Sequence, residues 1–139
     1  SVSLITYVYL NAAKMAVKMD DAARGEDLCQ RALDLVTDQN DQLGIAEAYK
    51  IYGMLYVLQE AWEQAEFYLM QSRNLFQTYD NLMGVGEVYR ELGLMYHLLG
   101  DPVQARQNLD KAHEAFTQMN APSSRQDIEQ LRDELSNDS

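Results

Sequence analysis

The amino-acid sequence predicts an all-α fold, an α-α superhelix (solenoid) of three helix pairs followed by one capping helix. Three observations lead to this prediction. The chain repeats itself at a shift of 40 residues, apolar residues within each copy recur at helical spacing, and the breaks between apolar segments carry residues that end and start helices. We take residues 1–139 as a single domain, with repeats at approximately 1–40, 41–80 and 81–120 and a capping helix at approximately 123–136.

The second and third copies of the repeat match each other without a gap. Residues identical at the 40-residue shift include Gly44 and Gly84, Glu47 and Glu87, Tyr49 and Tyr89, Gly53 and Gly93, Tyr56 and Tyr96, Ala65 and Ala105, and Leu69 and Leu109. The first copy has diverged further, but Tyr9 falls in the column of Tyr49 and Ala32 in the column of Ser72. The chain therefore holds three repeats and the first half of a fourth.

Each copy contains two predicted helices. One helix face of the second copy, with spacing i, i+3, i+4, i+7, is formed by Tyr49, Tyr52, Gly53 and Tyr56. A second face, later in the same copy, is formed by Ala65, Leu69, Ser72 and Phe76. The stretch Leu4–Leu10 has the composition of a strand, but we predict a helix there because Tyr9 shares the column of Tyr49 and no second strand is available for pairing.

The breaks between the predicted helices carry suitable end and start residues. Gly100 suits a helix end, Asp101 is a good N-cap, and Pro102 fits the first helical position, where its missing N–H costs nothing. Asn40-Asp41 and Asp80-Asn81 mark the breaks between repeats.

The terminal helix is predicted to cover the end of the stack. Ser123 followed by Gln126, or Ser124 followed by Asp127, has the form of a capping box. The helix has a narrow apolar stripe and is otherwise polar, which is typical of capping helices. The stripe is formed by Ile128, Leu131 and Leu135.

The charge balance and the cysteine count limit the partner and the compartment. With 11 Lys and Arg against 22 Asp and Glu, the net charge of −11 repels phosphate backbones, and we expect no nucleic-acid partner. Cys29 is the only cysteine and cannot form an internal disulfide, which favours a cytoplasmic protein. We expect no membrane contact, because the longest apolar run is too short to span a bilayer. Ser1 in place of Met suggests a piece of a longer protein.

These repeats resemble the tetratricopeptide repeat. The resemblance rests on the pattern Tyr49-x2-Tyr52-Gly53-x2-Tyr56 followed by Ala65-x3-Leu69, together with its counterpart from Tyr89 to Leu109, and it covers nearly the whole chain. The period is 40 rather than about 34 residues, Tyr replaces the usual Trp, and no proline directly follows the second helix. In these features the sequence resembles the extended-helix subgroup of the family, which is found in signalling adaptors and large bacterial regulators.

The resemblance implies a protein–protein interaction module, a scaffold or adaptor that holds a partner peptide in a concave groove and forms part of a larger regulatory protein. In the family, the first helix of each pair lines this groove. By register, the groove-facing candidates are Tyr7, Leu10, Lys14 and Val17 in the first copy, Glu47, Lys50, Met54 and Val57 in the second, and Glu87, Arg90, Leu94 and His97 in the third.

Lys50 and Arg90 share a column at which part of the family clamps a C-terminal carboxylate. The Asn that accompanies this clamp is replaced by Met54 and Leu94, so a chaperone-tail ligand is not favoured. We expect an extended or helical peptide with apolar anchors and a few acidic side chains.

Two alternative functions remain, self-association and catalysis. The first helix carries Leu4, Ile5 and Val8 with no cap before it, which favours a homodimer through this helix. An enzyme is the least favoured reading, because His97 and His113 lie on different helices and no calcium loop or phosphate-binding glycine loop is present. We predict no catalytic, cofactor-binding or metal-binding residues, and no cofactor.

Overall fold

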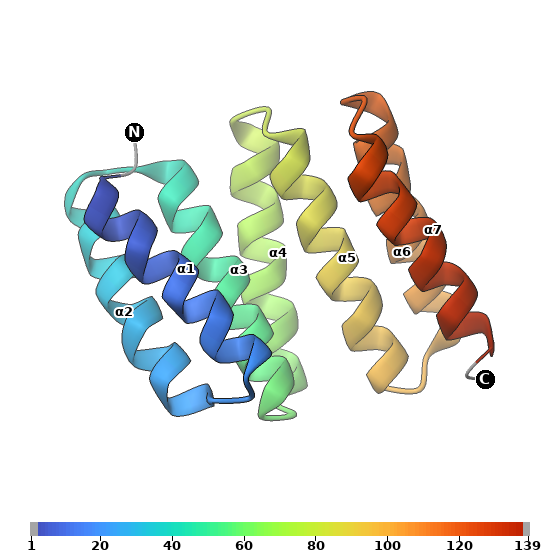
Figure 1. Cartoon of the computed structure of the whole chain (residues 1–139), viewed down its shortest axis with the longest axis horizontal. Helices are drawn as coiled ribbons and strands as arrows, with labels where there is room; N and C mark the ends of the chain where they lie inside the picture. Colours follow the sequence, from blue (N-terminus) through green and yellow to red (C-terminus); the bar gives the residue numbers. More distant parts are fainter. Residues whose placement is uncertain (1–2, 138–139) are drawn as a thin grey trace. The chain divides into compact units, whose positions relative to one another are not determined.

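The computed structural model describes residues 3–137, which form seven α-helices (Figure 1). In chain order the helices are α1 (Leu4–Lys18), α2 (Ala22–Asp38), α3 (Gln42–Leu58), α4 (Trp62–Thr78), α5 (Leu82–Leu98), α6 (Pro102–Gln118) and α7 (Pro122–Asn137). None of the described residues is in a β-strand, so the predicted all-α class of consecutive helix pairs with a final single helix is confirmed.

The strand-like start of the chain is helical, as predicted, because capping and burial outweigh local propensity. The side chain of Ser3 accepts a hydrogen bond from the backbone N–H of Thr6 at 3.2 Å, and the two hydroxyls are hydrogen-bonded at 2.8 Å. Thr6 and Leu10 are buried on one face of α1, whereas Ile5 and Val8 on the other face remain exposed.

The turns between helices share one geometry, repeated every 20 residues. The six turn residues with positive φ, between 52° and 78°, are Asp20, Asn40, Glu60, Asp80, Gly100 and Asn120. The N–H of the next residue donates to the carbonyl five residues back, as in Asp41 to Val36 and Asp101 to Tyr96, both at 2.9 Å. This is the hydrogen bond of the Schellman helix end. Each turn therefore closes one helix and sets the start of the next.

Four of the turns also carry an N-cap side chain. Asp21, Asp41, Asn81 and Asp101 accept a hydrogen bond from the backbone N–H three residues on. For α7 the predicted capping box is wrong, because the helix begins at Pro122 and both Ser123 and Ser124 lie within its first turn rather than at the N-cap. Proline is favoured at the first helical position, and Pro102 occupies the same position in α6.

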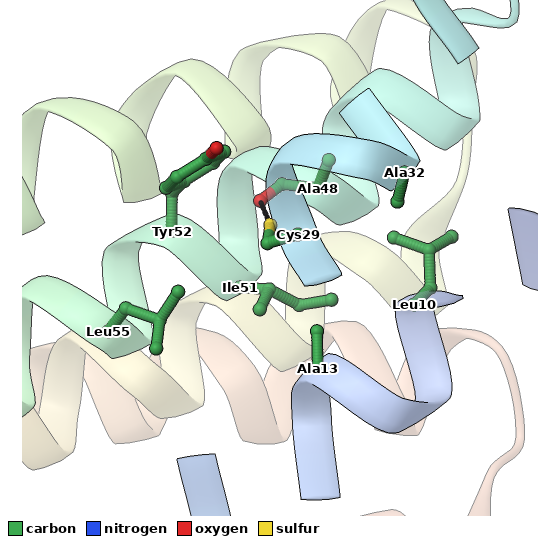
Figure 2. Close-up of a cluster of buried hydrophobic side chains, with 8 residues drawn as sticks. All are labelled: Leu10, Ala13, Cys29, Ala32, Ala48, Ile51, Tyr52 and Leu55. Carbon is green, nitrogen blue, oxygen red and sulfur yellow. Dashed lines mark hydrogen bonds between the residues drawn. The ribbon is translucent and has the colours of Figure 1, made fainter. Parts of the chain in front are cut away.

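The chain divides into two compact units, unit 1 (Ser1–Leu75) and unit 2 (Phe76–Ser139). The core of unit 1 is built from side chains of α1, α2 and α3, as Figure 2 shows. Its buried members are Leu10, Ala13, Cys29, Ala32, Ala48, Ile51, Tyr52 and Leu55. In unit 2, α5, α6 and α7 bury Val88, Leu92, Met95, Leu109, Phe116 and Ile128.

Small residues set the distance between the two helices of a pair. A Cβ added to Gly53 on α3 would lie 2.5 Å from Cγ of Leu69 on α4 and 3.3 Å from the carbonyl oxygen of Ala65. In unit 2, a Cβ added to Gly93 on α5 would lie 2.8 Å from Cγ of Leu109 on α6. The two helices therefore approach more closely than a side chain at these positions would allow.

The repeated turn predicts opposite effects for two matched substitutions. Glu60 and Gly100 occupy equivalent turn positions with φ of 56° and 78°. Replacing Glu60 by Gly removes the steric cost of the left-handed conformation, so we expect Glu60→Gly to raise the free energy of unfolding by about 1 kcal/mol. Gly100→Ala should lower it by about 1 kcal/mol.

Urea denaturation followed by circular dichroism measures both changes. A Cβ at Gly100 would meet no atom within 4 Å, so steric clashes do not complicate the second substitution. Equal midpoints for the wild type and both variants would contradict the assigned turn geometry.

Candidate partner-binding surface

In unit 1, two lysines on the first helices share one carboxylate. Glu47 Oε1 on α3 lies 3.2 Å from Nζ of Lys50 and 3.4 Å from Nζ of Lys14 on α1. The Lys50 side chain is only 6% exposed, and a buried ammonium requires such a partner, whereas the Lys14 side chain is 36% exposed. The accessible positive charge on this surface is therefore that of Lys14.

Apolar candidates lie next to this ionic cluster. Met54 and Val57 lie 7 and 10 residues after Glu47, on the same face of α3. Both side chains are half-buried. Val17 on α1 is also half-buried, and Tyr7 is 58% exposed. Together with Lys14, these side chains make up the candidate surface of unit 1, which is apolar apart from one accessible cation.

Leu10 does not lie on this surface. Its side chain is 4% exposed and packs in the core of unit 1 with Ala13 and Ile51 (Figure 2). Register places Leu10 in the column of Lys50, and both side chains point inward. Periodicity identified the helix face but not the depth to which the neighbouring helices cover it.

In unit 2, the four candidates on α5 are all half-buried, and Arg90 is held by acidic neighbours. Its Nε lies 2.7 Å from Oδ2 of Asp127 on α7, and its Nη1 lies 3.4 Å from Oε1 of Glu91. Burial works against the charge, but the two carboxylates outweigh it and raise the pKa of Arg90. The other three candidates are Glu87, Leu94 and His97.

Two of these acidic partners, Glu47 and Asp127, occupy one repeat column, of which the sequence analysis named Glu47 and Glu87 but missed Asp127. Glu47 forms an ion pair with Lys14 of the preceding first helix. Asp127, 80 residues later, forms an ion pair with Arg90, which also lies on the preceding first helix. The signal was present in the sequence, because positions 47, 87 and 127 are all acidic. These carboxylates reduce the positive charge that Lys50 and Arg90 present to a partner.

Further ion pairs connect α7 to α6. They join His113 to Glu129 at 2.8 Å and Arg132 to Asp110 at 3.0 Å. The hydrogen bond with His113 lowers the pKa of Glu129. With the Arg90–Asp127 pair, they connect the last helix to both α5 and α6.

A cluster of tyrosine rings fills the space between helices in unit 1. The ring of Tyr68 on α4 lies 5.5 Å from those of Tyr49 and Tyr56 and 5.6 Å from that of Tyr52. The Tyr52 hydroxyl donates a hydrogen bond to Oε1 of Gln30 at 2.6 Å, and burial raises its pKa. The Tyr56 ring stacks on that of Tyr68, whereas the Tyr49 ring meets it edge-on and the Tyr52 ring is tilted against it, as expected for packed aromatic residues.

Cys29 is a packing residue rather than a nucleophile. It is fully buried, and its thiol donates a hydrogen bond to the carbonyl oxygen of Ala48 at 3.3 Å (Figure 2). Burial, followed by the charge of Glu47, raises the pKa of the thiol to about 12. The reactive thiolate is therefore scarce at neutral pH.

Within residues 3–137, no three His, Cys, Asp or Glu side chains are grouped as metal ligands would be. The same part of the chain contains no helix long and apolar enough to cross a membrane.

One comparison with known proteins identifies a family. A family model described as "Tetratricopeptide repeat" matches residues 4–78, more than half of the chain. No curated protein matches the chain.

Proposed function

The chain belongs to the tetratricopeptide repeat family, whose members are in general protein-binding scaffolds rather than enzymes, and we propose that it binds an extended segment of a partner protein on its first helices. In unit 1 the contact surface comprises Tyr7, Lys14 and Val17 on α1 and Met54 and Val57 on α3. The corresponding surface of unit 2 lies on α5, with Leu94 and His97.

One observation carries this proposal. In a chain with a net charge of −11, the exposed side of α1 and α3 joins apolar side chains to an accessible lysine, Lys14. Met54 is well suited to an adaptable apolar contact, because its unbranched side chain can change shape to fit a partner. The partner segment would therefore offer aliphatic anchors and an acidic side chain near Lys14.

The supporting features also suggest a setting. The excess of carboxylates disfavours nucleic acid as a partner, and the single buried thiol is compatible with the cytoplasm. We place the module in the extended-repeat subgroup, as an adaptor within a larger regulatory protein.

Site-specific photo-crosslinking tests the proposed surface. A photoreactive benzoylphenylalanine is placed at Met54, and at Phe67, which is 56% exposed on α4, as the matched control. In extract of the source cells we expect one crosslinked protein with the Met54 probe and none with the Phe67 probe. Adding Lys14→Glu should reduce the yield several-fold, whereas Arg24→Glu on α2 should not.

The proposal fails if neither probe captures a protein, or if both capture the same proteins in equal amounts. Lys14 is preferred over Lys50 for charge reversal, because Lys50 is buried against Glu47 and its reversal would disturb the fold.

A second proposal, self-association, rests on the outer face of α1. Leu4 is 78% exposed, and Val8 and Met15 are each 55% exposed. The residues 40 positions later, Gly44, Ala48 and Leu55, are buried where α3 packs against α2 and α1. The exposed face of α1 therefore has the pattern of a helix-stacking surface, and we propose that a second copy of the chain covers it.

Sedimentation equilibrium tests self-association. We expect the wild type to dimerise as its concentration rises, and Val8→Glu to shift it to a monomer by placing a charge in the contact. Phe67→Glu, an equally exposed apolar residue on α4, is the control and should leave the dimer intact. A wild-type monomer at the highest concentration would rule out this proposal.

A further inference from the structure

A pocket in unit 2 lies where α5 ends, α6 begins and the last turns of α7 pass. Its volume is about 210 Å³, and its wall combines basic, apolar and hydroxyl side chains. The lining residues are His97, Pro102, Ala105, Arg106, Leu109, Arg132, Leu135 and Ser136. Two of the chain's 11 basic residues thus meet at one hollow of an acidic molecule.

The corresponding positions of unit 1 explain why this space is open. Eighty residues earlier, positions 52 and 56 carry tyrosine where α7 has Arg132 and Ser136. The Tyr52 ring is buried, and a Cβ added to Gly25 would lie 2.7 Å from a methyl carbon of Leu55. Aromatic and aliphatic side chains therefore fill this region of unit 1.

The changes of charge converge on the same pocket. Position 26 is Glu in the first copy, whereas its counterpart in the third copy is Arg106. Position 17 is Val, and its counterpart is His97. Together with the change from tyrosine to Arg132, each substitution replaces an acidic or uncharged side chain with a basic one.

One carboxylate holds both arginines in place. Asp110 Oδ1 lies 3.2 Å from Nε of Arg106 and 3.0 Å from Nη1 of Arg132. Unit 1 has a neutral counterpart at the same positions, the hydrogen bond from Tyr52 to Gln30. Each guanidinium uses a single N–H group in these contacts and has further donors. In these contacts two guanidinium groups share one carboxylate, so the positive groups outnumber the negative one.

We propose that this pocket binds the side-chain carboxylate of an acidic residue that is flanked by an aliphatic residue in a partner protein. The proposal rests on the proposed function as a protein-binding module and adds a specific subsite to it. The arginines would bind the carboxylate, which suits the planar guanidinium group. Leu109, Leu135 and Pro102 would contact the aliphatic neighbour.

Size and charge favour this ligand over larger or more highly charged ones. The pocket, at about 210 Å³, is smaller than the ~300–1,000 Å³ typical of sites for drug-sized molecules. A phosphate dianion would bring more negative charge than the pocket neutralises. A single carboxylate with an adjacent alkyl group matches both the volume and the charge.

A peptide titration followed by NMR tests the proposal on the full chain. The probe is an acetylated and amidated pentapeptide with glutamate between two leucines, and the matched probe carries glutamine in its place. We expect the glutamate probe to shift the methyl signals of Leu109 and Leu135. The glutamine probe should bind about tenfold more weakly, because a charged hydrogen bond is lost.

Two arginine variants locate the binding. Arg106→Gln and Arg132→Gln should each weaken the glutamate probe by about tenfold. The same change in Arg24 on α2 should have no effect. Circular dichroism checks each fold, and because the Arg106 side chain is 58% exposed, Arg106→Gln remains informative if Arg132→Gln is unstable.

The proposal would be overturned if the two peptides bound equally well, or if the methyl signals that shift did not include those of Leu109 and Leu135. Sodium acetate is titrated as well. If it shifts the same signals at the same concentration as the glutamate peptide, the pocket binds carboxylates in general, and the proposed contact with an aliphatic neighbour is wrong. Crosslinking at Met54 is read separately, so a failed pocket is distinguished from a failed interaction module.

Discussion

The close approach of the two helices within each pair is the constraint on which the rest of the structure depends. Gly53 faces Leu69 and the carbonyl of Ala65, and Gly93 faces Leu109 and the carbonyl of Ala105, at distances that leave no room for a Cβ. With this spacing set, the other faces of each first helix are determined. In unit 1, one face of α3 packs against α2 and α1, and the adjacent stripe carries Glu47, Met54 and Val57. The interior contact thus decides which side chains a partner can reach.

Much of the fold could be predicted from the sequence because its determinants are local and repeated. Glycines, tyrosines and alanines recur in fixed columns, and Gly100, Asp101 and Pro102 mark a helix end and the next helix start within three residues. The depth of burial could not be predicted in this way. Leu10 and Lys50 share a column and both lie under neighbouring helices, a tertiary effect that helical spacing does not encode. The αL conformation of Glu60 at the end of its helix could not be predicted, because glutamate lacks the usual preference for that conformation.

Electrostatics on the candidate surface is set by pairing rather than by composition. Glu47 and Asp127 neutralise Lys50 and Arg90, so the residues that looked most suited to hold an acidic partner are engaged within the protein. Positive charge available to a partner instead lies at Lys14 and at the pocket of Arg106 and Arg132. The basic character of this pocket stands out when the same positions are compared between copies, because each basic residue alone resembles an ordinary surface charge. Departures from the repeat are therefore the basis of the proposed pocket.

The unfolding free energy of a Gly93→Leu variant tests the central constraint most directly. Leucine would force α5 away from α6 at the Leu109 contact, and overpacking of this kind costs about 1–3 kcal/mol. Urea denaturation of the wild type and the variant, followed by circular dichroism at 222 nm, gives the difference. Val103→Leu is the control, because it places the same side chain on α6 at a position that is 64% exposed. We expect a clear loss for Gly93→Leu and little change for Val103→Leu. An unchanged midpoint for Gly93→Leu would contradict it.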